Sequence, residues 1–244
     1  MNNMSANDRC CWFASLFPLN YQISYQHQLL PADCTSRLLL DGDMSLTTEP
    51  DGKPRCQWCS VTEQYIAYHD DEWGYPVSDD QRLFEKLCLE SFQSGLSWRT
   101  ILAKRDNFRR AFRQFDFNKV ARFTDKDVER LLQDEGIVRH RGKIEAVINN
   151  AKRAKELVRQ EGSLAAYIWR YEPDPSSQAE PQSVSTTEES IALSKALKKM
   201  GWKFVGPTTV YAFMQAMGLV NDHSEGCYIR DKVSRARKRF KRPV

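Results

Sequence analysis

From residue 78 onward, apolar residues recur every three or four positions, the spacing of one face of an α-helix. The first of these segments begins at Ser78, which forms a capping-box pattern with Gln81, and ends near Gly95. Convincing runs of alternating apolar and polar residues are not evident, so the predicted fold class is all-α. Further helices are predicted around residues 97–102, 108–115, 124–136, 142–151 and 163–168.

Two more helices are predicted after a proline-rich stretch, residues 172–185, which has no core pattern and indicates an exposed loop. One runs from Glu188 to Gly201, and the other begins at Pro207, whose fixed φ suits a first helical position. The intervening turn and the first N–H groups of the second helix could bind a DNA phosphate. The alternative interpretation is an ordinary corner between helices with solvated lysines.

The chain divides into three parts. Residues 1–52 show no sustained period and end in turn residues, so we interpret them as a poorly ordered extension, with Met44 as a possible natural start. The globular domain is predicted over residues 53–227. Residues 228–244 carry eight basic residues and one acid in a chain of net charge +4, which indicates a basic tail suited to nucleic acid or simply a solvated end.

The cysteine count and the hydropathy pattern restrict the environment of the protein. Seven cysteines without the spacing of a disulfide scaffold favour a reducing, cytoplasmic protein. No segment reaches about 18 consecutive apolar residues, and no secretory signal is present at the start. We therefore expect a monomer that needs neither a membrane nor an organic cofactor.

One acid falls on an apolar helix face. Leu83, Leu87 and Glu90 project within about 40° of one another on a helix, so Glu90 faces the core. A buried carboxylate costs several kcal/mol unless it is paired, bound to metal or used. Two interpretations follow: an ion pair with an arginine, or a carboxylate at the floor of a binding pocket.

Five aromatic residues surround Glu90 in the sequence. A cluster of Trp and Tyr usually belongs to a hydrophobic core. Beside an acid, the same cluster can also stack a planar, positively charged ligand through cation–π attraction. These residues are Trp58, Tyr65, Tyr68, Trp73 and Trp98.

Cysteine and histidine residues at the two ends of the predicted domain have the composition of a zinc site. His223 and Cys227 are four residues apart, and Cys56 and His69 lie at the other end. Two thiolates and two imidazoles favour tetrahedral Zn²⁺, which would join the start of the domain to its end. Cys59 is a rival ligand because it forms a CxxC pair with Cys56, and the alternative is buried free thiols and hydrogen-bonded histidines.

Together these features resemble the type I 3-methyladenine DNA glycosylases of the helix-hairpin-helix superfamily. The resemblance extends from about Cys56 to Cys227 and includes the run Tyr-Ile-Ala-Tyr-His-Asp-Asp-Glu-Trp-Gly that begins at Tyr65. Other matching runs are residues 89–90, 95–98, 127–131, 136–144, 203–206 and 213–223. The sequence departs from the family at Ser91-Phe92, where the family often has Gly-Gln.

The resemblance implies a role for each matching position. It places one structural Zn²⁺ on Cys56, His69, His223 and Cys227, which favours Cys56 over Cys59. It assigns the hydrogen bonds to the base to Glu90 and Tyr68, with Trp98, Trp58, Trp73 and Tyr65 around it. It places the hairpin that contacts DNA at Lys203, Val205, Gly206, Thr208 and Thr209.

The activity implied is base excision repair of alkylated double-stranded DNA in the bacterial cytoplasm, at the nucleoid. Methylation at N3 gives adenine a positive charge, which stacked aromatic rings and a desolvated Glu90 carboxylate would favour. The base would be flipped out and hydrolysed off, leaving an abasic site. Pro207-Thr208-Thr209 stands where lyase-competent relatives carry a lysine, so no lyase activity is expected. The alternatives are a non-catalytic zinc-containing DNA-binding module and a glycosylase for another alkylated base.

Overall fold

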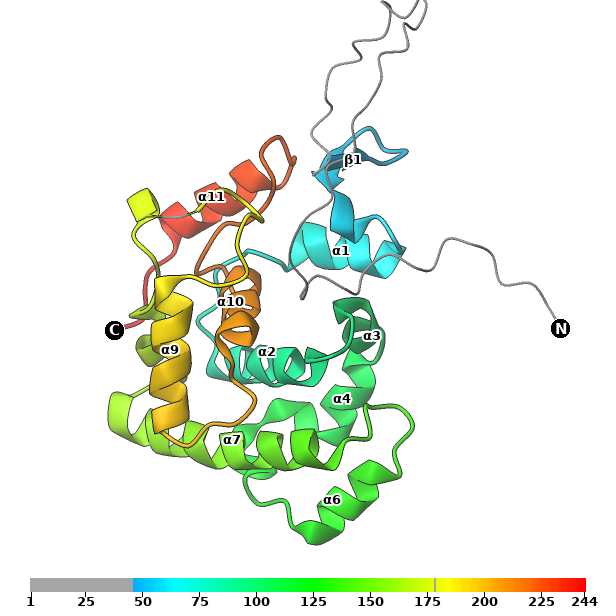
Figure 1. Ribbon diagram of the computed structural model, residues 1–244, viewed down its shortest axis with the longest axis vertical. Helices are drawn as coiled ribbons and strands as arrows, with labels where there is room; N and C mark the ends of the chain where they lie inside the picture. Colours follow the sequence, from blue (N-terminus) through cyan, green and yellow to red (C-terminus); the bar gives the residue numbers. More distant parts are fainter. Residues whose placement is uncertain (1–45, 178) are drawn as a thin grey trace, which may run out of the picture. The chain divides into compact units, whose positions relative to one another are not determined.

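The computed structural model describes residues 46–177 and 179–244, which are mostly helical, with two short strands at the start (Figure 1). The α-helices are α1 (Glu63–Asp71), α2 (Asp80–Gln93), α3 (Trp98–Ala103), α4 (Arg105–Ala111), α5 (Phe117–Val120), α6 (Asp125–Leu132), α7 (Arg141–Glu161), α8 (Leu164–Trp169), α9 (Glu188–Lys199), α10 (Pro207–Ala216) and α11 (Arg230–Arg239). Three 3-10 helices, η1 (Gln57–Cys59), η2 (Arg113–Phe115) and η3 (Pro175–Ser177), and the strands β1 (Leu46–Thr48) and β2 (Pro54–Cys56) complete the described elements. No described helix is long and apolar enough to cross a membrane.

Helix α2 is the central element of the domain. Every residue from Leu83 to Phe92 is buried, because α3, α7, α8 and α10 all pack against this helix. Its N-cap is Asp79, whose side chain accepts a hydrogen bond from the N–H of Arg82, so the start predicted at Ser78 is one residue early. Ser and Asp are both favoured N-cap residues, so the local sequence does not decide between Ser78 and Asp79.

Other helix boundaries follow the predicted signals. Ser97 and Ser163 cap α3 and α8, each accepting a hydrogen bond from the N–H three residues later. Thr124 and Asp127 form the capping box of α6, and Pro207 is the first residue of α10. These predictions are confirmed because each depends on contacts within one turn of the helix.

The turn between α9 and α10 is held by side chains from three helices. Asn150 of α7 bonds both backbone groups of Lys203, at 2.8 and 2.9 Å. Ser194 of α9 donates to the carbonyl of Val205 at 2.6 Å. The hydroxyl of Ser91 on α2 lies 2.9 Å from the carbonyl of Phe204, a residue with a φ of +56°. The turn therefore has a fixed backbone relative to α2.

The strands were not predicted. β1 and β2 form an antiparallel pair in which Leu46 lies opposite Cys56 and Gly52 turns the chain at a φ of +74°. Three residues per strand are too few to reveal a period of two in the sequence. The pair positions Cys56 at the start of η1. The interpretations that concern residues 1–45, including Met44 as a start, lie outside the described residues.

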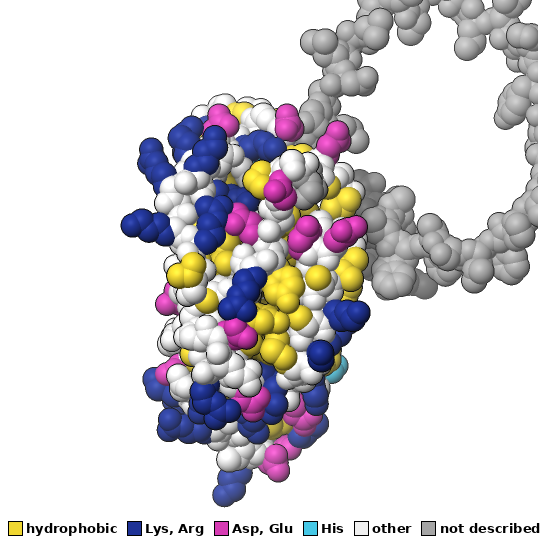
Figure 2. Space-filling view, turned by 90° about the vertical axis from the view of Figure 1, so that its left-hand side faces the viewer, with side chains coloured by type: hydrophobic (Ala, Val, Ile, Leu, Met, Phe, Trp, Pro, Cys, Tyr) yellow, Lys and Arg dark blue, Asp and Glu magenta, His cyan; other side chains and the backbone are white. Residues whose placement is uncertain are grey.

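The basic segment after Cys227 contains α11, which packs on the domain. Val233 is fully buried, and Arg237 donates to the carbonyl of Leu219 at 2.8 Å and to Glu172 at 2.9 Å. The ring of Phe240 contacts Trp169, with centroids 4.5 Å apart. Lys and Arg side chains gather at the upper end of the face in Figure 2, at the level of α11.

Candidate functional site

An aromatic pocket of about 140 Å³ lies where η1, α1, α2, α3 and α10 meet. Six of the residues that line this pocket are the predicted base-contacting ones, and three more, on α2 and α10, were not predicted. The lining consists of Trp58, Tyr65, Tyr68, Trp73, Glu90, Trp98, Gln93, Ala212 and Gln215. The structure therefore brings the whole predicted pocket set together.

Local geometry explains how the aromatic rings reach one wall. Tyr65 and Tyr68 are three residues apart on α1 and so project from the same face of the helix. Trp58 packs edge-on against Tyr65 and Trp73, with centroids 5.1 and 5.0 Å apart. Trp98, the first residue of α3, contacts Tyr68 at 5.3 Å. Each ring is thus restrained by another, so the aromatic wall is preformed.

Glu90 lines this pocket and is also paired with a cation. Its Oε1 lies 2.7 Å from Nζ of Lys86, one turn earlier on α2, and both side chains are nearly fully buried. Glu90 therefore has both of the roles considered from the sequence: it lines a pocket and it forms an ion pair. The partner in the ion pair is a lysine and not the expected arginine. Burial lowers the pKa of Lys86 to about 8, although the Glu90 carboxylate opposes this shift.

Lys86 was not predicted as a residue of the site, and its ammonium group makes two further contacts with the pocket wall. Nζ donates a hydrogen bond to Oη of Tyr68 at 2.7 Å and lies 3.2 Å from the centroid of the Trp98 ring. The spacing of four residues between Lys86 and Glu90 is the signal that could have revealed it, since such pairs meet on a helix.

A second hollow of about 310 Å³, the α10 groove, adjoins the aromatic pocket. Its lining shares Glu90, Gln93 and Ala212 with the pocket and adds Ser94, Gly95, Leu96, Thr208 and Thr209. The pocket therefore opens toward the N-terminus of α10.

The predicted DNA-contacting residues lie in the turn before α10 and in its first positions. Thr208 and Thr209 line the α10 groove, and Gly206 is the N-cap of α10. Lys203 is exposed. The side chain of Val205 is only 1% exposed, so this residue can reach a ligand only through its backbone.

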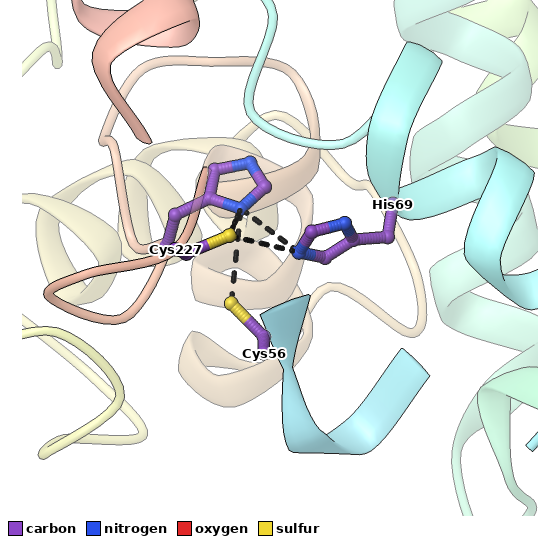
Figure 3. A group of neighbouring side chains, drawn as sticks. Cys56, His69 and Cys227 are labelled. Atoms are coloured by element: carbon purple, nitrogen blue, oxygen red, sulfur yellow. Dashed lines mark hydrogen bonds between the residues drawn. The ribbon is translucent and has the colours of Figure 1, made fainter. Parts of the chain in front are cut away.

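A cluster of two cysteines and two histidines lies beside the aromatic pocket. Cys56 comes from the end of β2, His69 from α1, and Cys227 from the loop before α11 (Figure 3). With His223, each offers one atom to a common centre, and these four atoms lie within 4.8 Å of one another. Cys59 is buried but is not one of the four.

Four nitrogen–nitrogen and nitrogen–sulfur distances within the cluster are close to those of tetrahedral coordination. The facing nitrogens of His69 and His223 are 3.2 Å apart, and Sγ of Cys227 lies 3.5 and 3.7 Å from them. Sγ of Cys56 lies 3.8 Å from Nδ1 of His223. A tetrahedral zinc ion with ordinary bond lengths separates two nitrogens by about 3.3 Å and a nitrogen from a sulfur by about 3.6 Å.

Hydrogen bonds outside the cluster orient both imidazoles toward its centre. Nδ1 of His69 donates to Asp70 at 2.8 Å, and Nε2 of His223 donates to the carbonyl of Trp73 at 3.0 Å. The nitrogens that face the centre therefore carry lone pairs, as metal ligands require. The hydrogen bond from Cys56 lowers the pKa of Cys227, which favours the thiolate form that binds a metal ion.

Residues 58–231 match the family described as methyladenine glycosylase. The chain belongs to this family. DNA-3-methyladenine glycosylase 1 of Escherichia coli K12 is 51% identical over 177 residues, which cover 71% of this chain and 95% of that protein. DNA-3-methyladenine glycosylase of Haemophilus influenzae is 48% identical over 177 residues, covering 71% of this chain and 96% of that protein.

Solved structures of family members have the same fold. A crystal structure of 3-methyladenine DNA glycosylase I is 49% identical, has a TM-score of 0.67, and matches 71% of this chain and 98% of its own. The Staphylococcus aureus enzyme is 35% identical, with a TM-score of 0.67 and coverage of 72% and 96%. A variant 3-methyladenine DNA glycosylase I in complex with 3-methyladenine is 36% identical, with a TM-score of 0.68 and coverage of 72% and 97%. The predicted family is confirmed.

Proposed function

We propose that this protein removes 3-methyladenine from alkylated double-stranded DNA as the first step of base excision repair. The observation that carries the proposal is the aromatic pocket: a slot of Trp and Tyr rings around one carboxylate, open to the N-terminus of a helix. Membership of the methyladenine glycosylase family and the names of its similar members support this substrate. A non-catalytic DNA-binding module has no use for such a pocket.

The residues of the pocket bind the flipped base in this proposal. Glu90 and Tyr68 form hydrogen bonds with the edge of the base, because both are polar residues that line the slot. Trp98, Trp58, Trp73 and Tyr65 surround its faces and edges. Stacking on these rings favours a planar cation over a neutral base.

The reaction is a hydrolysis at C1′ of the deoxyribose. The bond between C1′ and N9 breaks, its electron pair stays with the base, and the methylated base leaves as a neutral molecule. Water supplies the oxygen that binds C1′ and releases a proton. Because methylation has already made the base a good leaving group, the main energetic demand on the protein is extracting the nucleotide from the stack, which costs a few kcal/mol.

The DNA backbone is proposed to bind at the turn between α9 and α10, used as a helix-hairpin-helix element. Backbone N–H groups of Gly206, Thr208 and Thr209 lie at the start of α10, where anions bind favourably. Lys203 adds a charge to the same turn, and Val205 contributes its backbone. The groups hold a phosphate beside the opening of the aromatic pocket.

Leu96 is proposed to fill the space that the extracted nucleotide leaves in the duplex. It is 42% exposed, an uncommon position for leucine at a polar rim, and it lines the α10 groove next to Glu90. Proteins that unstack DNA often insert an apolar side chain between base steps.

We propose that the Cys56, His69, His223 and Cys227 cluster holds one structural Zn²⁺. Four protein ligands close the site, and thiolates favour zinc over magnesium or calcium. A bound ion would join β2 and α1 to the loop before α11 and stabilise the wall of the aromatic pocket. It supplies no step of the hydrolysis.

Release of free bases from DNA methylated in vitro tests the proposed function, with each base separated by chromatography. The wild-type protein is expected to release 3-methyladenine and leave abasic sites, and Glu90→Gln to be much slower. Glu85→Gln is a matched control, because Glu85 lies on the same helix as Glu90, pairs with Arg109 of α4, and does not line the aromatic pocket. A wild-type protein that releases no 3-methyladenine refutes the activity, and a fully active Glu90→Gln refutes the role of Glu90.

A further inference from the structure

Lys86 is a buried cation beside a pocket that is proposed to bind a cationic base. Two positive charges so close together would repel each other. The Lys86 ammonium group does not line the aromatic pocket. It lies behind the wall, where it lines a small cavity of about 20 Å³ together with the charged residues Glu72, Arg82, Glu85 and Arg105. Lys86 therefore acts on the pocket through the residues that it contacts.

The three hydrogens of the Lys86 ammonium group match three contacts, all with residues of the pocket wall. These are Oε1 of Glu90 at 2.7 Å, Oη of Tyr68 at 2.7 Å, and the face of the Trp98 ring at 3.2 Å. An ammonium group only donates, so both oxygen atoms accept from it. This contact pattern determines what each oxygen can still offer to a ligand.

Tyr68 becomes a donor to the pocket. Since its oxygen already accepts from Lys86 and cannot donate to an ammonium group, its own O–H hydrogen is available to a bound base. Glu90 becomes an acceptor, because only its Oε1 binds the ammonium group, which leaves its second oxygen for a ligand. Tyr68 and Glu90 thus present one donor and one acceptor to the pocket, beside the amides of Gln93 and Gln215, which can serve as either.

Adenine and guanine differ in the edge that would meet these two groups. Adenine offers an acceptor at N7 beside a donor at N6, whereas guanine offers two acceptors, N7 and O6. The adenine pattern complements Tyr68 and Glu90. The guanine pattern places O6 against a carboxylate, where two acceptors repel each other and neither is hydrogen-bonded.

We propose that Lys86 is a positioning residue that sets the hydrogen-bond polarity of the aromatic pocket and so selects adenine-type over guanine-type alkylated bases. The inference rests on the proposed function. The sequence led us to expect that an unpaired Glu90 carboxylate attracts the cationic base. Because the Lys86–Glu90 pair has no net charge, the hydrogen-bond pattern contributes more to base selection than the charge of Glu90 does.

The ratio of 3-methyladenine to 3-methylguanine release from the same methylated DNA tests this proposal. In Lys86→Met, Tyr68 and Glu90 lose the ammonium group that both accept from, and Tyr68 can turn its hydrogen away from the base, so the ratio should fall about tenfold or more. Lys86→Arg keeps the donors and the charge and should retain a ratio near that of the wild type. Glu85→Gln removes a charge from another ion pair of α2 and should leave the ratio unchanged.

A purely structural role gives a different result. If Lys86 only stabilises α2, Lys86→Met slows release of both bases equally, and the unchanged ratio overturns the proposal. If Lys86→Met does not fold, Tyr68→Phe carries the test, because it removes the donor while keeping Lys86; its ratio should fall, and an unchanged ratio again overturns the proposal. Loss of all 3-methyladenine release in the wild type would instead refute the proposed function.

Discussion

Trp73 and His223, 150 residues apart, are joined by a hydrogen bond of 3.0 Å from Nε2 of the histidine to the tryptophan carbonyl. Their rings also meet edge to face, with centroids 4.6 Å apart. Trp73 lines the aromatic pocket and His223 belongs to the Cys–His cluster. Tyr68 and His69 make a second connection, since they are consecutive residues of α1. The cluster and the pocket therefore share one wall.

Loss of a cluster ligand should impair the pocket as well as the stability of the domain. We expect Cys227→Ala to lose bound zinc, to be destabilised by on the order of several kcal/mol, and to bind free 3-methyladenine more weakly. Metal analysis, thermal unfolding and quenching of tryptophan fluorescence by 3-methyladenine measure the three effects.

Two cysteines outside the cluster serve as controls. Cys88→Ala removes a buried thiol of α2 and Cys59→Ala removes the rival ligand, and both should keep stoichiometric zinc. Wild-type protein purified without zinc, or Cys227→Ala with a full complement, would contradict the assignment. Loss of zinc in Cys59→Ala would make Cys59 the ligand.

The Lys86–Glu90 pair should show the behaviour of a buried ion pair. Glu90→Leu leaves the ammonium group buried and uncompensated and should cost about 3–5 kcal/mol. Lys86→Met combined with Glu90→Leu fills the space with apolar groups and should be about as stable as the wild type. Denaturant unfolding gives the four free energies of the cycle, and a double variant as unstable as the sum of the single variants would contradict this expectation.

The stability of the protein should depend on Lys86 above pH 8. Its pKa is lowered by burial to about 8, below the value of about 10.5 in an unfolded chain, so the unfolded state binds more protons between these pH values. Stability relative to Lys86→Met should therefore rise as pH increases through this window, by at most about 1.4 kcal/mol per pH unit.

The other titratable groups around Lys86 are the same in both proteins: Glu90, Tyr68, Glu72, Arg82, Glu85 and Arg105. Comparing denaturant unfolding of the wild type with that of Lys86→Met at pH 7, 8 and 9 thus isolates Lys86. Two parallel curves would show that its proton is not released in this range.

The exposed basic side chains of α11 and the segment after it should strengthen DNA binding by neutralising phosphates. Replacing Lys232, Arg235, Lys238 and Lys241 by Gln should reduce the dependence of DNA affinity on salt, by about 0.9 in the logarithmic slope for each phosphate that is no longer neutralised. Titrations at several salt concentrations measure this slope, and an unchanged slope would exclude a DNA role for these residues.

Substitution is the better experiment than a cut at residue 228. Tyr228 donates a hydrogen bond to Asp70, which in turn orients His69, and Arg237 is buried against Leu219 and Glu172. A truncated chain would lack these interactions, so a change in its DNA affinity would mix charge with stability. Base release by the substituted protein should remain close to that of the wild type.

Local sequence determined the helical class, several helix starts and the family of this protein, but α1, α11 and the second half of α7 were not predicted. Caps such as Ser97 and Thr124, and the apolar spacing of α2, depend on residues within a few positions of one another. The motif runs around Tyr65 and Phe213 carry the family resemblance in the same way. The sequence also placed Glu90 on the apolar face of its helix, because the residues one turn earlier are enough to define that face.

Only the tertiary structure decided what surrounds those residues. It placed Ala212 and Gln215 of α10 opposite Glu90, packed α11 on the domain, and selected Cys56 rather than Cys59 to face His223. It also showed that Lys86 contacts Tyr68 and Trp98. The sequence could have predicted only the pairing of Lys86 with Glu90, which is four residues away on the same helix. These relationships depend on packing between segments far apart in the chain. The number of residues between two such segments does not tell how close they lie in space.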